Sequence, residues 1–204
     1  MATRGRPRGF DRDVALRRAM TVFWEHGFEG ASIADLTTTM GISAPSLYAA
    51  FGSKVDVYRE SVALYRATDG ALTRRALEAP TARQAIEAML RDNADAYTDP
   101  GTPRGCMIVL SGPGDTVRDD AVHAFLVELR AATLDAVRAR LARAVDEGDL
   151  PAGCDVGSVA ELYVTVLYGL SVKARDGATR DDLSRVADAA MAAWPAMTGL
   201  LTAT

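Results

Sequence analysis

Residues 32–51 read SIADLTTTMGISAPSLYAAF, and this stretch has the spacing of a helix-turn-helix. Two short helical segments meet at Gly41, a residue that readily takes the positive φ of a tight turn between helices. Ser32 and Ser43 can cap the two helices, and Pro45 falls in the first turn of the second, where a missing N–H does no harm. Such a unit lays its second helix in the major groove of DNA. The stretch therefore predicts DNA binding, although a helical hairpin that binds no DNA can share this spacing.

The sequence around this motif predicts an all-α chain. Alanine and arginine, both strong helix formers, account for 37 and 21 of the 204 residues, and no segment shows the alternation of a strand. Apolar periodicity and capping residues predict about nine helices. They are expected at residues 11–26, 32–40, 43–51, 53–65, 82–97, 106–110, 119–147, 156–174 and 179–194. We divide the chain into a helix-turn-helix DNA-binding domain with a basic arm, residues 1–52, and a larger helical domain, residues 53–204.

Charge is unevenly distributed along the chain. Residues 1–18 hold six arginines against two aspartates, whereas residues 61–204 carry a net charge of −5 and the whole chain −4. Basic blocks of this kind often form nucleic-acid-binding arms, so Arg4, Arg6 and Arg8 are candidates for contacts in a narrow minor groove. A solubilising tail would have the same composition. The pattern agrees with a positive DNA-binding end on an acidic body.

Other function classes find little support in the sequence. No apolar run approaches the roughly 18 residues of a membrane span, and no apolar stretch follows the basic N-terminus as in a secretory signal. Cys106 and Cys154 are too few for a disulfide scaffold, which favours a reducing cytoplasm. No serine has a histidine partner nearby in the sequence, and no Glu-x-x-His or His-x-x-x-His spacing suggests a metal. We therefore expect no enzyme, no metal, no cofactor and no membrane partner.

Two segments resemble regulators of the TetR/AcrR family. One is GISAPSLYAAFGSK at residues 41–54, and the other, which precedes it, is Phe23 together with GFEGASI at residues 27–33. The detailed match covers residues 10–60. Thr37 departs from the pattern, because the family usually has a small alanine packed between the two motif helices. The resemblance implies an all-helical homodimer with a DNA-binding head and a body that binds a small-molecule effector and thereby loses operator affinity. It implies a repressor acting on a palindromic operator in double-stranded DNA.

The resemblance also suggests which residues meet DNA. The Tyr48 hydroxyl and the Lys54 ammonium match the family's phosphate contacts, and the helix N-terminus at Ser32 can hold another phosphate. The candidates for reading base edges are Ala44, Pro45, Ser46 and Ala49. None of these four can make a bidentate hydrogen bond to a base, so we expect contacts to thymine methyl groups, with the Ser46 hydroxyl as the lone hydrogen-bonding reader.

An effector pocket is expected among the helices that follow the motif. Its candidate residues are mostly apolar, with phenolic handles: Tyr97, Cys106, Met107, Leu110, Phe125, Tyr163 and Leu167. Cys106 follows Arg104-Gly105 at the start of a short helix, where a positive charge and the helix N-terminus would lower the pKa of a thiol. Some related regulators with a similar Arg-Gly-Cys segment sense electrophiles or oxidants through that thiol, which gives an alternative mechanism of release. A cysteine that is only a buried small hydrophobe is the other interpretation.

The last two long helices carry broad apolar faces. Their candidate interface residues are Val159, Val166, Leu170, Leu183, Val186, Ala190 and Trp194. Such faces can pack within one chain, but in the resembled family they form a four-helix interface across a two-fold axis, and we expect that arrangement here. Two heads then address half-sites about one helical turn, or a multiple of it, apart. A helical protein-interaction module with no DNA role is the alternative outside the regulators.

Overall fold

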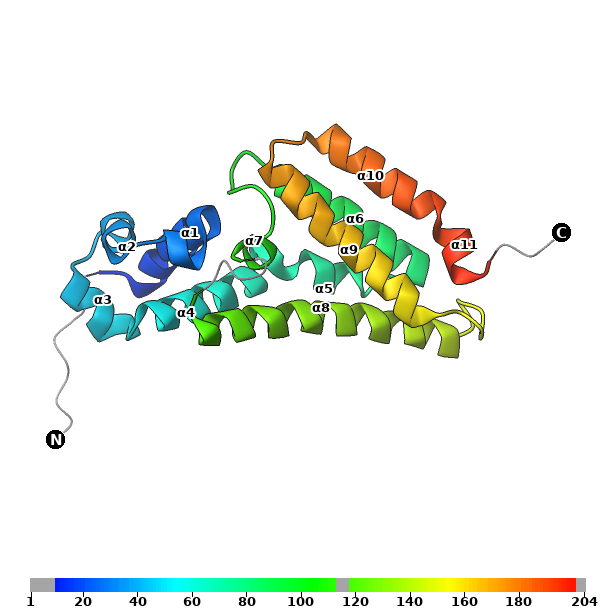
Figure 1. Ribbon diagram of the computed structural model, residues 1–204, viewed down its shortest axis with the longest axis horizontal. Coiled ribbons are helices and arrows are strands. Elements are labelled where there is room, and N and C mark those ends of the chain that lie inside the picture. The colour runs from blue at the N-terminus through cyan, green and yellow to red at the C-terminus, as the bar shows by residue number, and fades with distance from the viewer. Residues whose placement is uncertain (1–9, 113–117, 201–204) are drawn as a thin grey trace.

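The computed structural model describes residues 10–112 and 118–200, and all regular secondary structure in these two ranges is helical (Figure 1). The elements are α1 (Arg12–Gly30), α2 (Ile33–Met40), α3 (Ala44–Phe51), α4 (Lys54–Ala67), the 3-10 helix η1 (Asp69–Ala71), α5 (Leu72–Ala76), α6 (Ala82–Tyr97), α7 (Met107–Leu110), α8 (Asp120–Asp146), α9 (Val156–Arg175), α10 (Arg180–Ala192) and α11 (Trp194–Thr198). The expected all-α fold is confirmed. The sequence did not predict η1, α5 and α11, because each has at most five residues and none has a side-chain N-cap to mark its start.

Helix boundaries follow the capping residues that the sequence displays. Ser32 and Asp35 form a capping box at the start of α2, and α4, α6 and α10 begin with the same device. Gly41 ends α2 with φ 71°, as the predicted turn requires. At Gly27 the backbone leaves the helical region with φ 70°, so the stop predicted after His26 marks a kink within α1. Local capping thus sets where most helices begin and end.

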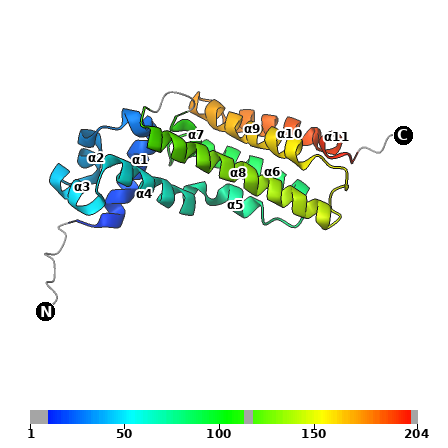
Figure 2. The same cartoon turned by 60° about the horizontal axis from the view of Figure 1, so that its bottom comes forward.

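The helices build two hydrophobic cores that α8 joins. The first core lies among α1–α4, α7 and the first part of α8, and the second among α5, α6, α9, α10 and the last part of α8. With 27 residues, α8 is about 40 Å long and reaches along both cores. Figures 1 and 2 show it running beside α4 and α5, with α1–α3 grouped at one end of the molecule. Val57, Tyr58 and Val62 of α4 lie in the first core, so α4 packs with the head although the expected domain boundary precedes it.

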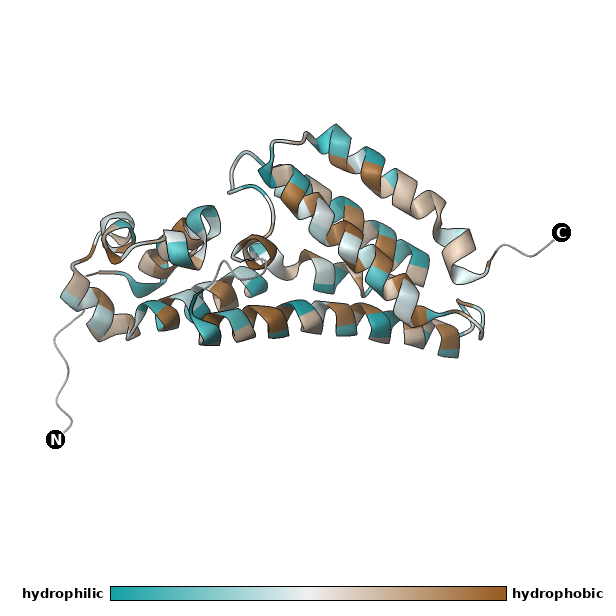
Figure 3. Ribbon diagram, in the orientation of Figure 1, coloured by the Kyte–Doolittle hydropathy of each residue, from teal (hydrophilic) through white to brown (hydrophobic). Residues whose placement is uncertain are grey.

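One face of α8 carries a buried apolar stripe. Val122, Leu126, Leu129, Val137 and Leu141 are all at most 8% exposed, and brown apolar bands recur along the helix in Figure 3. Within the described ranges, no helix combines the length and the apolar character that a membrane crossing needs.

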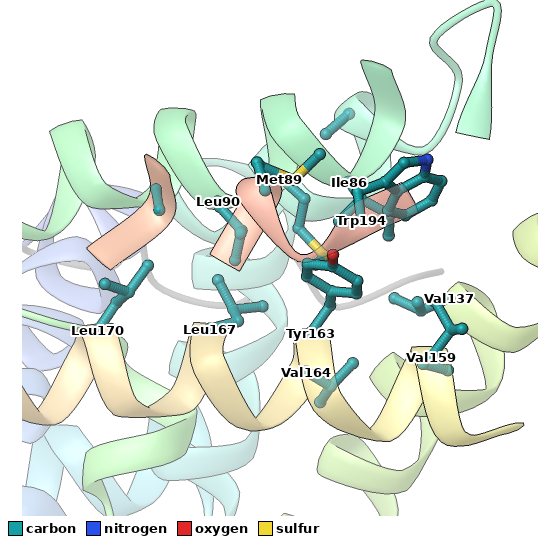
Figure 4. Close-up of a cluster of buried hydrophobic side chains, with 14 of the residues drawn as sticks. Ile86, Met89, Leu90, Val137, Val159, Tyr163, Val164, Leu167, Leu170 and Trp194 are labelled. Atoms are coloured by element: carbon teal, nitrogen blue, oxygen red, sulfur yellow. The ribbon is translucent and has the colours of Figure 1, made fainter. Parts of the chain in front are cut away.

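The apolar faces of α9 and α10 pack inward, with α9 on α6 and α8 and α10 on α6 and α9 (Figure 4). Four of the predicted interface residues are at most 1% exposed in the single chain: Val159, Leu170, Leu183 and Trp194. The prediction that these four contact a second copy is wrong, because a side chain without exposed surface cannot touch a partner. Val166, Val186 and Ala190 pack at the edge of the same core and keep part of their surface exposed. An apolar stripe in a sequence does not identify the helix that packs against it, and here the packing helices belong to the same chain.

Candidate DNA-binding surface and effector cavity

The outer face of α3 is the candidate reading surface. Leu47 and Phe51 anchor this helix in the first core, whereas Tyr48 is 51% exposed. The predicted base-reading residues are exposed or half-buried: Ala44, Pro45, Ser46 and Ala49. Figure 1 places α3 at the end of the molecule that lies farthest from the body. The described part of the chain therefore leaves this face uncovered and able to approach a DNA groove.

A tight turn fixes α3 relative to α2. Gly41 has φ 71°, and a Cβ there would lie 3.4 Å from Arg18 Nη1, which itself donates to the Met40 carbonyl at 3.4 Å. Thr37, the departure from the family pattern, is half-buried and donates its hydroxyl to the Ile33 carbonyl at 2.8 Å. Because this hydroxyl is satisfied within α2, threonine fits between the motif helices without an unpaired polar group.

Two of the predicted phosphate ligands are held by neighbours. Lys54 Nζ lies 4.3 Å from the centre of the Phe28 ring, and partial burial lowers the pKa of this ammonium. The hydroxyl and the backbone N–H of Ser32 both donate to Asp35 Oδ2, at 2.6 and 3.0 Å. A phosphate would contact Ser32 only by displacing the Asp35 carboxylate, so this contact stays a prediction.

Arg12 joins three elements of the head. Its Nη2 lies 2.7 Å from both carboxylate oxygens of Glu60, and its guanidinium lies 4.3 Å from the centre of the Phe51 ring. Its Nε donates to the Ala50 carbonyl at 3.4 Å, so α1, α3 and α4 share one cation. The partners lie 38 and 48 residues away, and no local pattern reveals such a role. The arm residues lie outside the described ranges, and their role stays a prediction: Arg4, Arg6 and Arg8.

A cavity of about 850 Å³ opens between α8 and the segment α4–α5, and residues of α6, α7 and α9 also line it. This volume suits a small organic molecule. Of the predicted effector residues, three line it: Tyr97, Cys106 and Leu167. The other four predicted effector residues lie outside it: Met107, Leu110, Phe125 and Tyr163. Met107 is fully buried in the first core, and Tyr163 donates its hydroxyl to the Ala190 carbonyl at 3.0 Å inside the second, because their apolar surface is used for packing.

Cys106 stands half-buried at the wall of this cavity. The phenols of Tyr65 and Tyr97 lie beside its thiol, and burial raises the pKa of both well above the ordinary value, so both stay neutral. The guanidinium of Arg104, which the sequence placed near the thiol, donates instead to two backbone carbonyls at and just beyond the end of α9, both at 3.1 Å. Across the described part of the chain, no three His, Cys, Asp or Glu side chains gather as a metal site would need.

Gly105, next to this cysteine, connects the cavity wall to the DNA-binding head. Its carbonyl accepts a buried hydrogen bond of 2.9 Å from Trp24 Nε1 of α1. Arg175, the last residue of α9, donates to the carbonyls of Trp24 and Glu25 at 2.7 and 2.9 Å. Gly105 has φ 78°, and a Cβ there would lie 2.7 Å from the carbonyl oxygen of Ser171. Only glycine fits this position, and no local pattern in the sequence predicts the link.

Comparison with known proteins covers both the head and the body. Residues 15–60 match the model described as "Bacterial regulatory proteins, tetR family", and residues 81–194 match "Tetracyclin repressor-like, C-terminal domain". The transcriptional repressor ComR of Escherichia coli (strain K12) is 32% identical over 197 residues, which is 95% of this chain and 93% of that protein. The repressor BdcR of the same strain is 32% identical over 190 residues, covering 92% and 90%.

Solved structures extend the likeness to a complex with DNA. A cysteine mutant of the TetR family regulator CifR, complexed with 26-bp double-strand operator DNA, superposes with a TM-score of 0.90 and 45% identity, covering 93% of this chain and 100% of that one. A TetR regulator from Rhodococcus sp. RHA1 has a TM-score of 0.60 and 37% identity, covering 89% and 98%. Together with the exposed α3, these matches show that the chain belongs to the tetR family of bacterial regulatory proteins and is a DNA-binding transcriptional regulator.

Proposed function

We propose that this chain is a homodimeric repressor that acts in the cytoplasm, binds a palindromic operator and releases it when a small molecule enters the cavity. The segment 104–106 supports this function, because it both lines the cavity and contacts the DNA-binding head. Cys106 lines the cavity, while the neighbouring Gly105 carbonyl accepts the Trp24 indole N–H from the head. A ligand that displaces this segment therefore acts on the head directly. No catalytic activity, metal or cofactor is part of the mechanism.

At the operator, α3 enters the major groove and its flanking residues hold phosphates. Tyr48 and Lys54 supply the phosphate contacts, which fix the register without reading sequence. Pro45 and Ala49 present small apolar surfaces that fit thymine methyl groups. The Ser46 hydroxyl lies 2.9 Å from Ser43 Oγ and retains capacity for one further hydrogen bond to a base. The net negative charge of the chain opposes non-specific adhesion to DNA, so only the head docks.

The outer faces of α9 and α10 form the proposed dimer interface, since their inner faces are used within the chain. Thr165 and Gly169 of α9 and Ala189 and Ala192 of α10 are exposed and small. Small side chains let helices of two copies approach closely across a two-fold axis. To match the half-sites of a palindrome, the two α3 helices must lie about 34–36 Å apart, or a multiple of this distance.

Release follows from the connection between the cavity and α1. A bound ligand displaces Gly105, and the Trp24 indole moves with the carbonyl that it binds. Arg175 transmits motion of α9 to the last turn of α1 before the kink, because it holds the carbonyls of Trp24 and Glu25. A shift of α1 changes the distance between the two heads of the dimer. Only one distance fits both half-sites, so the ligand-bound state loses affinity.

Gel shifts with the DNA just upstream of the chain's own gene test this function. The wild type should bind, and the double variant Tyr48→Phe, Lys54→Ala should bind at least about tenfold more weakly and with a smaller dependence on salt, because phosphate contacts are lost. Arg83→Ala removes a cation from the exposed start of α6 in the body and should bind like the wild type. Unchanged binding by the double variant would refute α3 and its flanks as the contact surface.

Covalent modification of Cys106 is a second proposed route to release. Cys106 lines the cavity, whereas Cys154 lies outside it and has its pKa raised by burial and by Asp155. An electrophile or oxidant that enters the cavity would therefore meet Cys106 first. Limited alkylation followed by mass spectrometry measures the two rates. If Cys106 reacts no faster than Cys154, this route is excluded.

A further inference from the structure

The effector cavity is strongly positive although the protein is acidic. Its charged lining residues are Arg66, Arg74, Glu78, Arg130, Arg140 and Arg143. The wall of the cavity thus carries five guanidinium groups and one carboxylate, in a chain whose net charge is −4. A cluster of like charges around a cavity raises the local concentration of ions of opposite sign. The composition of the wall therefore favours an anionic ligand.

Arg140 is the buried member of this group. It is 3% exposed, and its Nη2 donates to the carbonyls of Ala79 and Pro80 at 3.0 and 3.2 Å, which fixes the position of the guanidinium. Its Nε and Nη1 have no hydrogen-bond partner, and within the described residues no carboxylate lies close enough to form an ion pair with it. A buried charge whose donors have no partner is unfavourable unless a ligand accepts hydrogen bonds from them.

The neighbouring carboxylates are already used by other donors. Asp149 Oδ2 accepts the N–H of Ala82 at 2.6 Å, and Glu147 lies 3.6 Å from Arg143 Nε. Burial lowers the pKa of Arg140, and yet an arginine stays charged in proteins. The unpaired donors of Arg140 therefore belong to a permanent cation at the wall of the cavity.

The cavity is elongated, and apolar side chains line it between the charged ones, together with polar residues such as Thr73, Asn93 and Thr133. The stretch of α8 from Leu129 to Arg143 lines it, which corresponds to about 21 Å along the helix axis. Three small residues leave space beside α8: Ala132, Ala136 and Ala139. Leu167 and Tyr97 line the cavity with Leu129 and Cys106. A molecule with one charged end and an apolar body matches this combination.

We propose that the effector is an amphipathic organic anion, whose carboxylate, sulfate or phosphate headgroup binds the guanidinium of Arg140 and whose apolar body extends along α8 toward Leu129 and Leu167. This assignment rests on the proposed role of the cavity as the effector site. The headgroup accepts hydrogen bonds from Nε and Nη1, the atoms of Arg140 that have no partner, while the Ala79 and Pro80 carbonyls hold Nη2 in place. The apolar body then reaches the end of the cavity formed by Cys106, next to the link with α1.

Calorimetric titration with decanoate and with 1-decanol tests the assignment, because the two probes share an apolar chain and differ in the charge of the head. The wild type should bind decanoate at least about tenfold more tightly, the effect of hydrogen bonds to a charged group. Arg140→Met should abolish this preference, so that decanoate and 1-decanol bind the variant with similar affinity. Arg138→Met is the matched control, since Arg138 lies on the same helix, pairs with Glu161 at 2.7 Å and does not line the cavity.

Equal binding of decanoate and 1-decanol to the wild type, or a preference that survives in Arg140→Met, would overturn the assignment. Decylammonium provides a test that needs no variant: the wild type should not bind it, and binding as tight as that of decanoate would equally overturn the assignment. Gel shifts of the ligand-free protein report on the proposed function separately. If the protein binds decanoate through Arg140 and yet binds no DNA, the assignment of the anion site stands and the proposed repressor function is refuted.

Discussion

Replacing Gly105 with alanine tests the link between the cavity and the head. Gly105 has φ 78°, a conformation that costs an alanine roughly 1–2 kcal/mol. A Cβ at this position would lie 2.5 Å from Leu110 Cδ1, 2.7 Å from the Ser171 carbonyl oxygen and 3.0 Å from Ser171 Oγ. The Leu110 methyl can rotate away, but the Ser171 backbone belongs to α9 and cannot. The segment itself must therefore shift, and the Trp24 hydrogen bond shifts with it.

The expected loss has two parts that a second variant separates. Gly148 has φ 77° and a Cβ there would meet nothing within 4 Å, so Gly148→Ala carries the backbone strain alone. Gly105→Ala adds overpacking, typically about 1–3 kcal/mol, and a strained or broken bond to a buried carbonyl, about 1–3 kcal/mol if it is lost. We expect Gly105→Ala to lower the free energy of unfolding by about 2–4 kcal/mol more than Gly148→Ala.

Urea denaturation at one fixed protein concentration measures both variants, because the stability of a dimer depends on concentration. Operator affinity without ligand should fall in Gly105→Ala and stay at the wild-type level in Gly148→Ala. If the two variants are destabilised equally, to within about 0.5 kcal/mol, the close packing of Gly105 against Ser171 is not what fixes the segment. If operator affinity is unchanged in a destabilised Gly105→Ala, the segment does not control the head.

Three further predictions concern other parts of the chain. Replacing Arg6 and Arg8 with alanine should lower operator affinity and weaken the preference for a narrow minor groove; an operator scan with unchanged affinity and base preference would remove the arm from the mechanism. Hydrogen bonds from Ser53 hold the pKa of Asp56 below its usual value, so the ionised carboxylate stabilises the fold above its unfolded pKa, and this contribution disappears as the pH falls through the folded pKa. Asp56→Asn should therefore flatten the acid limb of a plot of stability against pH, and an acid limb parallel to that of the wild type would contradict this. Arg175→Met removes the hydrogen bonds that join α9 to α1 and should lower the free energy of unfolding by about 1.5–3 kcal/mol in urea denaturation, whereas a loss below about 0.5 kcal/mol would mean that the link is not stabilising.

The DNA-binding end could be predicted from the sequence because its determinants are local. Ser32 and Ser43 cap helices that begin at the next residue, and Gly41 supplies a turn that depends only on its own backbone. The exposed position of Tyr48 follows from its place beside Leu47 on a short amphipathic helix. The role of Arg12 could not be predicted, because its carboxylate partner lies 48 residues away and only folding brings it near.

The lining of the cavity was predicted only in part. Tyr97, Cys106 and Leu167 line it, but Tyr163 has the same phenolic character and lies in the core. Arg140 gave no signal, because an arginine in a long helix is ordinary until its neighbours bury it. A cavity is the volume that packing leaves unfilled, and this depends on how several helices fit together rather than on any one of them.

Local sequence patterns were enough to predict that the chain is helical, where most helices begin and end, and that a helix-turn-helix lies near residue 40. These features depend on interactions over a few residues, namely caps, turns and apolar spacing. Which apolar faces pack within the chain, where the cavity lies and how it reaches the head all depend on how the helices pack together. The decisive contacts join residues that are distant along the chain, such as Trp24 with Gly105 across 81 residues and Arg140 with Ala79 across 61, and only the packing of the helices brings them together.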